Sequence, residues 1–191
     1  MYSDIQNMFS VDRVLDNIPL STQVQVIRFS GREMTDEVTN ELQLSGDLLS
    51  TLRELDRFIP TQLQTYPMSD SALHEQLVQD YPVIAIRELL LNAVLHRSYE
   101  SNSPIRLYWF NNRIEIQNPG GLYGEATPEN FPRQNAYRNP IIAEALKALG
   151  YVNRFGRGVY RAQKLLNDNG NPPPDFDFQP TFVSATIHKR S

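Results

Sequence analysis

Three polar side chains recur at helical spacing inside an otherwise apolar stretch of the chain. Glu88, Asn92 and His96 follow one another at intervals of four residues. In a helix this spacing stacks side chains along one stripe. A carboxylate and a carboxamide one turn apart suit a divalent cation and an activated water, because the amide oxygen is a hard ligand and the carboxylate accepts a proton. The stripe is therefore a candidate site; the alternative is the solvated polar face of an ordinary amphipathic helix.

The helix that would carry this stripe is apolar on nearly all its other sides. It runs from Val83 to about Arg97, and Pro82 precedes it at a position that favours a first turn. Aliphatic residues occupy most of the remaining positions: Ile84, Ile86, Leu89, Leu90, Leu91, Ala93, Val94 and Leu95. A helix that is apolar almost all round is a buried one. Because a buried carboxylate without a partner costs on the order of several kcal/mol, Glu88 must face water, a polar partner or a ligand, whereas His96 is expected to pack or to form hydrogen bonds.

The composition of the chain excludes several classes of function. The 191 residues contain no cysteine, which rules out disulfides, thiolate metal sites and cysteine nucleophiles. The net charge of −4 provides no general attraction to DNA or to anionic membranes. No secretory signal is visible, and the longest apolar stretch is too short to span a bilayer, so we expect a cytoplasmic protein without a membrane partner.

The elements expected around the central helix indicate the fold class. Strands are predicted at residues 22–29, 37–44, 105–110, 113–117 and 182–188, helices at 47–63, 140–149 and 156–167, and a long loop at 122–139. Asp47 is placed to cap the first of these helices, and Pro60 is expected to break it. The order of strands and helices predicts an α+β sandwich, with a mixed sheet covered by helices on one face.

Four sequence blocks together resemble one known family. They are residues 87–99 (RELLLNAVLHRSY), 112–122 (NRIEIQNPGGL), 138–142 (RNPII) and 150–158 (GYVNRFGRG). In this order they resemble the C-terminal ATP-binding domain of RecG-like, Schlafen/AlbA-type bacterial transcriptional regulators. That domain is a divergent branch of the GHKL ATPases, so the resemblance implies a Bergerat-type (GHKL-like) sandwich that binds ATP and Mg²⁺.

The resemblance also implies a role for individual residues. Glu88 matches the carboxylate that polarises the attacking water, and Asn92 matches the Mg²⁺ ligand. Asn118 matches the acidic residue that accepts a hydrogen bond from the adenine amine. The remaining matches are Gly120 and Gly121 beside the nucleotide, Gly156 and Gly158 in a second glycine box at the phosphates, and the loop 122–139 as the ATP lid, from which Arg133 or Arg138 would reach phosphate.

Two readings of the function follow, in different classes. The first is an ATP-binding regulatory module of a bacterial transcriptional regulator, with slow Mg²⁺-dependent hydrolysis if turnover occurs. The second is a degenerate GHKL-like fold that acts as a nucleotide-independent interaction or homodimerisation module, because Asn118 stands where Asp is usual and the second glycine box has two glycines. A third, DNA contact through Arg154, Arg157, Arg161 and Lys164, competes with phosphate contact and with an ordinary solvated face.

The resemblance also predicts how the chain is divided. Residues 66–191 are expected to form the GHKL-like domain, and residues 1–65 a remnant that resembles the end of an AlbA-type domain plus a helix. The chain thus corresponds to the C-terminal half of such regulators, without their winged-helix tail. We therefore expect DNA binding by this polypeptide alone to be doubtful.

Overall fold

A six-stranded mixed sheet organises the chain, of which the computed structural model describes residues 23–71, 73–133, 136–152 and 156–190. The strand order is β2-β1-β5-β6-β8-β7. The strands are β1 (Val24–Phe29), β2 (Val38–Leu44), β5 (Ile105–Trp109), β6 (Arg113–Pro119), β7 (Asp175–Phe178) and β8 (Phe182–His188). The pair β1 and β5 is parallel, and every other neighbouring pair in this sheet is antiparallel.

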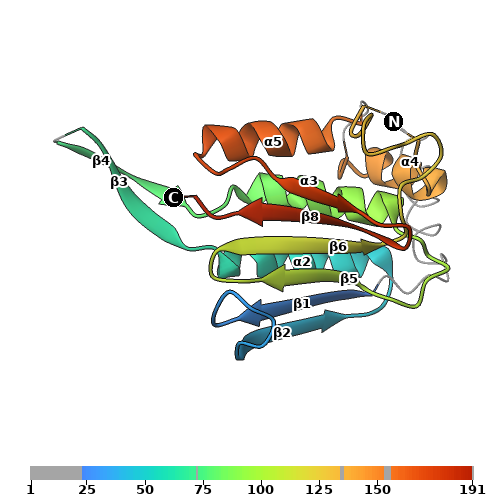
Figure 1. Cartoon of the computed structure of the whole chain (residues 1–191), viewed down its shortest axis with the longest axis horizontal. Helices are drawn as coiled ribbons and strands as arrows, with labels where there is room; N and C mark the ends of the chain where they lie inside the picture. The colour runs from blue at the N-terminus through green and yellow to red at the C-terminus, as the bar shows by residue number, and fades with distance from the viewer. Residues whose placement is uncertain (1–22, 72, 134–135, 153–155, 191) are drawn as a thin grey trace, which may run out of the picture.

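The described residues also form four helices: α2 (Leu48–Gln62), α3 (Val83–His96), α4 (Pro140–Ala148) and α5 (Gly158–Asp168). Figure 1 shows α2 and α3 lying behind the strands. One face of β5 and β6 is buried, because apolar residues alternate along both strands and point toward the helices. The α+β sandwich and the Bergerat/GHKL-like arrangement predicted from the sequence are thereby confirmed.

Helix α3 forms the centre of this arrangement. It packs along α5 on one side and contacts β6, α2 and α4 on others. Nine of its fourteen residues are buried, and these include the charged residue Glu88. The near-complete apolar surface predicted for this segment is therefore a consequence of its place between the sheet and α5.

One of the two prolines at these helices behaves differently from the sequence-based expectation. Pro60 does not break its helix: α2 continues to Gln62, although proline has no N–H to donate to the preceding turn. Pro82 lies at the N-cap of α3, one residue before the first helical position.

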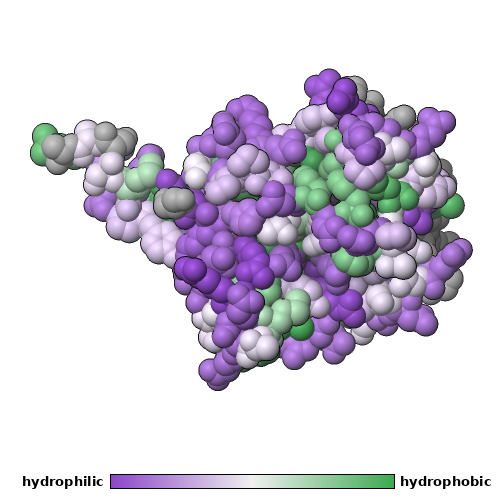
Figure 2. Space-filling model, viewed as in Figure 1, coloured by the Kyte–Doolittle hydropathy of each residue, from purple (hydrophilic) through white to green (hydrophobic). Residues whose placement is uncertain are grey.

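The β3–β4 ribbon is an element that the sequence analysis did not predict. Strands β3 (Thr65–Ser71) and β4 (His74–Gln79) pair with each other only and project from the body of the domain (Figures 1 and 2). Leu77 on β4 is 75% exposed. Strand β7 was also not predicted. The predicted domain boundary between residues 65 and 66 falls within β3, after its first residue, and strands from both sides of it share the six-stranded sheet.

Residues 1–22 of the predicted segment 1–65 lie outside the described part of the chain. Within the described part, no helix combines the length and the apolar character that crossing a bilayer requires.

The N-cap of α2 gives a stability prediction. The carboxylate of Asp47 accepts a hydrogen bond of 2.8 Å from the backbone N–H of Ser50, and this bond lowers the pKa of Asp47. Asp47→Ala should reduce the free energy of unfolding by about 1 kcal/mol at neutral pH. Because the folded pKa is depressed, this stabilisation exists above the unfolded pKa and is lost as the pH falls through the folded pKa.

Urea denaturation of both proteins at pH 7 and at about pH 3 measures the difference. Glu54→Ala, which removes an exposed carboxylate from the same helix, is the control. An Asp47→Ala protein as stable as the wild type at pH 7 would contradict the capping role.

Candidate functional site

A cavity of about 130 Å³ opens between α3, the strands β6 and β8, the start of α5 and the loop 122–139. Most of its lining is apolar, and Figure 2 shows hydrophobic surface gathered where α5, β8 and α4 meet. The polar or charged side chains among the described lining residues are Glu88, Asn92, His96, Asn118, Tyr123, Tyr137 and Arg157. An apolar pocket with a few convergent polar groups is the usual form of a small-molecule site.

The structure brings most of the predicted site residues to this one cavity. Its lining includes Glu88, Asn92, Asn118, Gly121, Gly156 and Gly158. Gly120 and Arg138 do not line it. The predicted residues come from three segments that are well separated in the sequence, and the fold alone places them around a common space.

Asn118 supplies the most unusual polar atom of the cavity. Its backbone pairs with Val183 in the sheet, which fixes the side chain near the end of β6. The residue is 6% exposed, and its Oδ1 has no hydrogen-bond partner among the described residues. Leaving a buried acceptor unpaired costs about 1–3 kcal/mol. A ligand that donates a hydrogen bond would remove this cost.

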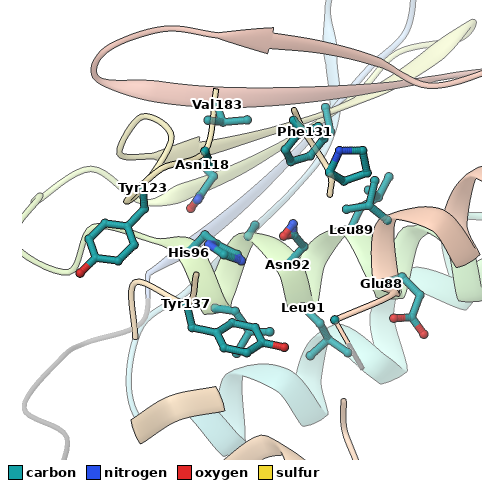
Figure 3. A pocket seen from close by; sticks show the side chains of 18 of the residues that line it. Glu88, Leu89, Leu91, Asn92, His96, Asn118, Tyr123, Phe131, Tyr137 and Val183 are labelled. Carbon is teal, nitrogen blue, oxygen red and sulfur yellow. The ribbon is translucent and has the colours of Figure 1, made fainter. Parts of the chain in front are cut away.

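Asn92 and His96 face Asn118 from α3. In Figure 3 the amides of Asn92 and Asn118 point toward the same space, and the ring of His96 lies beside them. Burial and, to a smaller extent, the nearby positive charge of Arg138 together lower the pKa of His96 to about 4. His96 is therefore neutral near pH 7, and its ring offers one donor and one acceptor.

Glu88 lies on the same stripe but is engaged differently. Its Oε1 accepts hydrogen bonds from Arg87 at 3.0 Å and from Arg161 at 2.8 Å. A Cβ added at Gly158 would lie 3.0 Å from Oε2 of Glu88, so the glycine lets α5 approach the carboxylate closely. Figure 3 shows the Glu88 carboxylate turned away from the two amides. In this arrangement Glu88 fastens α5 to α3 through a buried, doubly paired charge.

Packing against neighbouring chain segments explains why glycine occupies positions 120 and 121. Gly120 has a φ of +102°, and a Cβ there would lie 3.0 Å from the Cβ of Ser98. A Cβ at Gly121 would lie 2.7 Å from the carbonyl oxygen of Pro180 and 2.8 Å from that of Gln179. Both glycines are thus required by the close approach of neighbouring chain segments, whether or not a ligand is present.

The second glycine box places the start of α5 at the cavity wall. Gly156, with a φ of +58°, Arg157 and Gly158 all line the cavity. The first amides of a helix have no carbonyl partner within it and carry a partial positive charge. This end of α5 is therefore suited to an anionic group of a ligand.

The arginines of the loop do not reach the cavity in this structure. Arg138 donates a hydrogen bond of 2.8 Å to the carbonyl oxygen of Gly121, and its guanidinium lies 4.9 Å from the centre of the Tyr123 ring. Arg133 is exposed and is not among the lining residues. Contact of either arginine with phosphate would require a movement of the loop.

Aromatic residues of the loop were missed by the sequence analysis. Phe131 lines the cavity and packs against Phe176 and Phe178 of β7, with ring centres 4.9 Å apart in both pairs. Tyr137 lines the cavity as well and lies 5.8 Å from the ring of His96. The only signal was the presence of these aromatic residues in a polar, proline-rich loop, because their partners are distant in the sequence.

Two further expectations concern ions and DNA. Within the described residues, no cluster of three His, Cys, Asp or Glu side chains is arranged to hold a metal ion. Of the basic cluster proposed for DNA contact, Arg161 pairs with Glu88, Lys164 pairs with Asp168 at 2.6 Å, and Arg154 lies outside the described residues. These ion pairs reduce the positive charge that the cluster offers to a polyanion.

Comparison with known families supports the resemblance noted in the sequence. Residues 102–187 match the family described as "Putative ATP-dependent DNA helicase recG C-terminal", whose domain is of the HATPase type. The resemblance to a RecG-like C-terminal ATP-binding domain is thereby confirmed for these residues. The match includes β5, β6, α4, α5 and β7 and begins after α3, so Glu88 and Asn92 lie outside it.

One solved structure with the same fold is the crystal structure of the DIP2311 protein from Corynebacterium diphtheriae. It superposes with a TM-score of 0.80 at 25% sequence identity, and the similarity covers 90% of this chain. This chain spans only 36% of that protein. No curated protein matches the chain.

The ion pairs of Glu88 give a second prediction. Glu88→Gln keeps the shape of the side chain but leaves two half-exposed guanidiniums without their shared anion. The free energy of unfolding should fall by about 1–3 kcal/mol, and the effect should not be rescued by salt. Chemical denaturation of the variant measures this loss, and Glu144→Gln, which removes an exposed ion pair with Lys147, is the matched control. A loss no larger than that of the control would argue against the clamp.

The lowered pKa of His96 gives a third prediction. Since the folded pKa is about 4 and the ordinary value is 6.5, the unfolded chain takes up a proton first as the pH falls. The stability of the wild type should therefore decline from pH 6.5 to pH 4, and His96 should account for about 1–3 kcal/mol of that decline.

His96→Gln should flatten the dependence of stability on pH within this window. Asn92→Ala, which alters the same cavity without removing a titrating group, should keep the wild-type slope. Equal slopes for wild type and His96→Gln would show that His96 is not buried in its neutral form.

Proposed function

From the RecG-like match and the cavity, we propose that the chain is an ATP-binding regulatory module in which the adenine and the phosphates occupy opposite ends of the cavity. The observation that carries this proposal is the unpaired, buried Oδ1 of Asn118, which faces an otherwise apolar pocket. A purine ring fits such a lining because its faces are apolar and its edge carries hydrogen-bonding groups. ATP is the nucleotide that the HATPase-type family supports.

The two ends of the cavity differ in chemistry as a nucleotide requires. At one end Asn118 would accept a hydrogen bond from the adenine amine, with Ile116 and Ala185 against the ring. At the other, Gly156, Gly158 and the first amides of α5 would hold phosphate oxygens. Asn92 lies between the two ends on α3.

Asn92 is the residue that would contact Mg²⁺. A neutral amide oxygen is a suitable hard ligand, and Mg²⁺ in nucleotide sites takes most of its remaining ligands from phosphate and water. The lack of a carboxylate cluster among the described residues is therefore compatible with a metal that arrives with the nucleotide. The protein would contribute one oxygen, and the nucleotide would contribute the charge.

Glu88 would act as the general base if hydrolysis occurs. Its Oε1 is already engaged by two guanidiniums, and the carboxylate is turned away from Asn92 and Asn118, so it would have to change its contacts to reach a water in the cavity. We therefore propose slow turnover that serves regulation, with the nucleotide acting mainly as a bound effector.

The test is calorimetric titration of the chain with ATP and Mg²⁺. Asn118→Leu should weaken binding about 10–100-fold, because it removes the acceptor while preserving the side-chain volume. The same variant should be as stable as the wild type or more so, since it also removes an unpaired buried oxygen. Asn92→Ala should weaken binding only when Mg²⁺ is present.

These outcomes separate a ligand site from a structural role. A structural Asn118 would lower stability when replaced, whereas a ligand-binding Asn118 would lower affinity alone. If the wild type shows no binding at millimolar ATP, the proposed function is wrong.

A second candidate function is a nucleotide-independent interaction module. The observation in its favour is that Glu88, Gly120, Gly121 and Gly158 each have a packing role that needs no nucleotide. A homodimer in light scattering whose melting temperature does not respond to ATP would support this alternative. We also propose that this module is part of a transcriptional regulator. The chain spans only 36% of the DIP2311 protein, so the role of a whole protein of this kind stays a proposal for this chain.

A further inference from the structure

The polar side chain at the proposed base end of the cavity is the amide of Asn118, and an amide can either donate or accept a hydrogen bond. Asn118 carries one acceptor oxygen and two N–H donors on the same planar group. Turning this group by half a rotation exchanges the positions of the oxygen and the nitrogen with little change in shape. A carboxylate at the same place would offer acceptors only at neutral pH.

Purine bases differ in polarity at the edge that such a group would contact. A 6-aminopurine has a donor amine beside the acceptor N1, whereas a 6-oxopurine has an acceptor oxygen beside the donor N1–H. An amide in one orientation complements the first edge, and in the other orientation it complements the second. The preference of the cavity therefore depends on whether its other groups fix one orientation of Asn118.

None of the described neighbours fixes that orientation. Oδ1 of Asn118 accepts no hydrogen bond from the described residues, so no donor holds it in place. His96 lies beside Asn118 in Figure 3, and its neutral ring can exchange its donor and acceptor by tautomerism. The strand residues beside Asn118 in the lining, Ile116, Val183 and Ala185, are apolar.

Two fixed charges near the cavity are already held by other groups. The Glu88 carboxylate turns away from Asn118 and is held by two arginines. The guanidinium of Arg138 is held at the carbonyl oxygen of Gly121 and does not line the cavity. The base end is thus bounded by groups that adapt to the polarity of a ligand.

We infer that the cavity binds both 6-aminopurine and 6-oxopurine nucleotides, with Asn118 as the residue that determines this breadth. The inference rests on the proposed nucleotide site and extends it from ATP to a wider class of ligand. It assigns to Asn118 a specificity role that a carboxylate at this position would not fill.

The experiment compares ATP, ITP and UTP by calorimetry, each with Mg²⁺, on the whole chain. ITP differs from ATP at the purine ring only and carries the 6-oxo group without a 2-amino group. The wild type should bind ATP and ITP with affinities within about tenfold of each other and should bind UTP far more weakly. This comparison needs no variant and so does not depend on the folding of one.

Two variants then test the role of Asn118. Asn118→Asp should weaken ATP and ITP alike, each about 10-fold or more, because on either edge one carboxylate oxygen would face an acceptor of the base and could not donate to it. Asn118→Leu should weaken both nucleotides to a similar extent. Melting temperatures of the variants confirm that each is folded under the conditions of titration.

The outcomes distinguish this inference from the function on which it rests. Binding of ATP with no measurable binding of ITP would overturn the inference and leave the ATP site in place. Absence of binding by every nucleotide would overturn the proposed function itself. Wild-type affinity for both ATP and ITP in Asn118→Asp would remove Asn118 as the determinant of this breadth.

Discussion

The enclosure of α3 is the constraint on which the rest of the structure depends. Because the sheet, α2 and α5 cover this helix, each polar side chain on it must be matched by a neighbour or must face the cavity. Glu88 is matched by two arginines, while Asn92 and His96 face the space below Asn118. The same burial that requires these matches also produces a water-poor site in which neutral hydrogen-bonding groups are effective.

The cavity is built by segments whose proximity depends on the sheet. Strand β6 carries Asn118 and continues into the glycine turn, whereas β8 beside it presents Val183 and Ala185 to the same space. Helix α5 approaches from the other side because Gly158 has no side chain to keep it from Glu88. The cavity therefore takes Asn118 from the sheet, an end suited to an anion from a helix and aromatic side chains from a loop.

The sequence allowed prediction of those features that depend on local spacing. We could predict the period of α3, the hairpin turn between β5 and β6 and the Asp47 cap, because each depends on residues a few positions apart. The pairing of Glu88 with Arg161 was not, since 73 positions separate the two residues. Nor could the sequence reveal that Gly121 faces the carbonyl of Pro180, or that the β3–β4 ribbon would form outside the main sheet.

The ties at the two ends of the loop also determine how it can move. Arg138 binds the carbonyl of Gly121, and Asn139 donates to the carbonyls of Leu95 and Arg97 at 3.0 and 2.9 Å. The chain between Gly121 and Arg138 is thus closed at its neck like an Ω-loop. Since Phe131 also packs against Phe176 and Phe178 of β7, the wall that this loop gives to the cavity is held in its middle as well as at its ends.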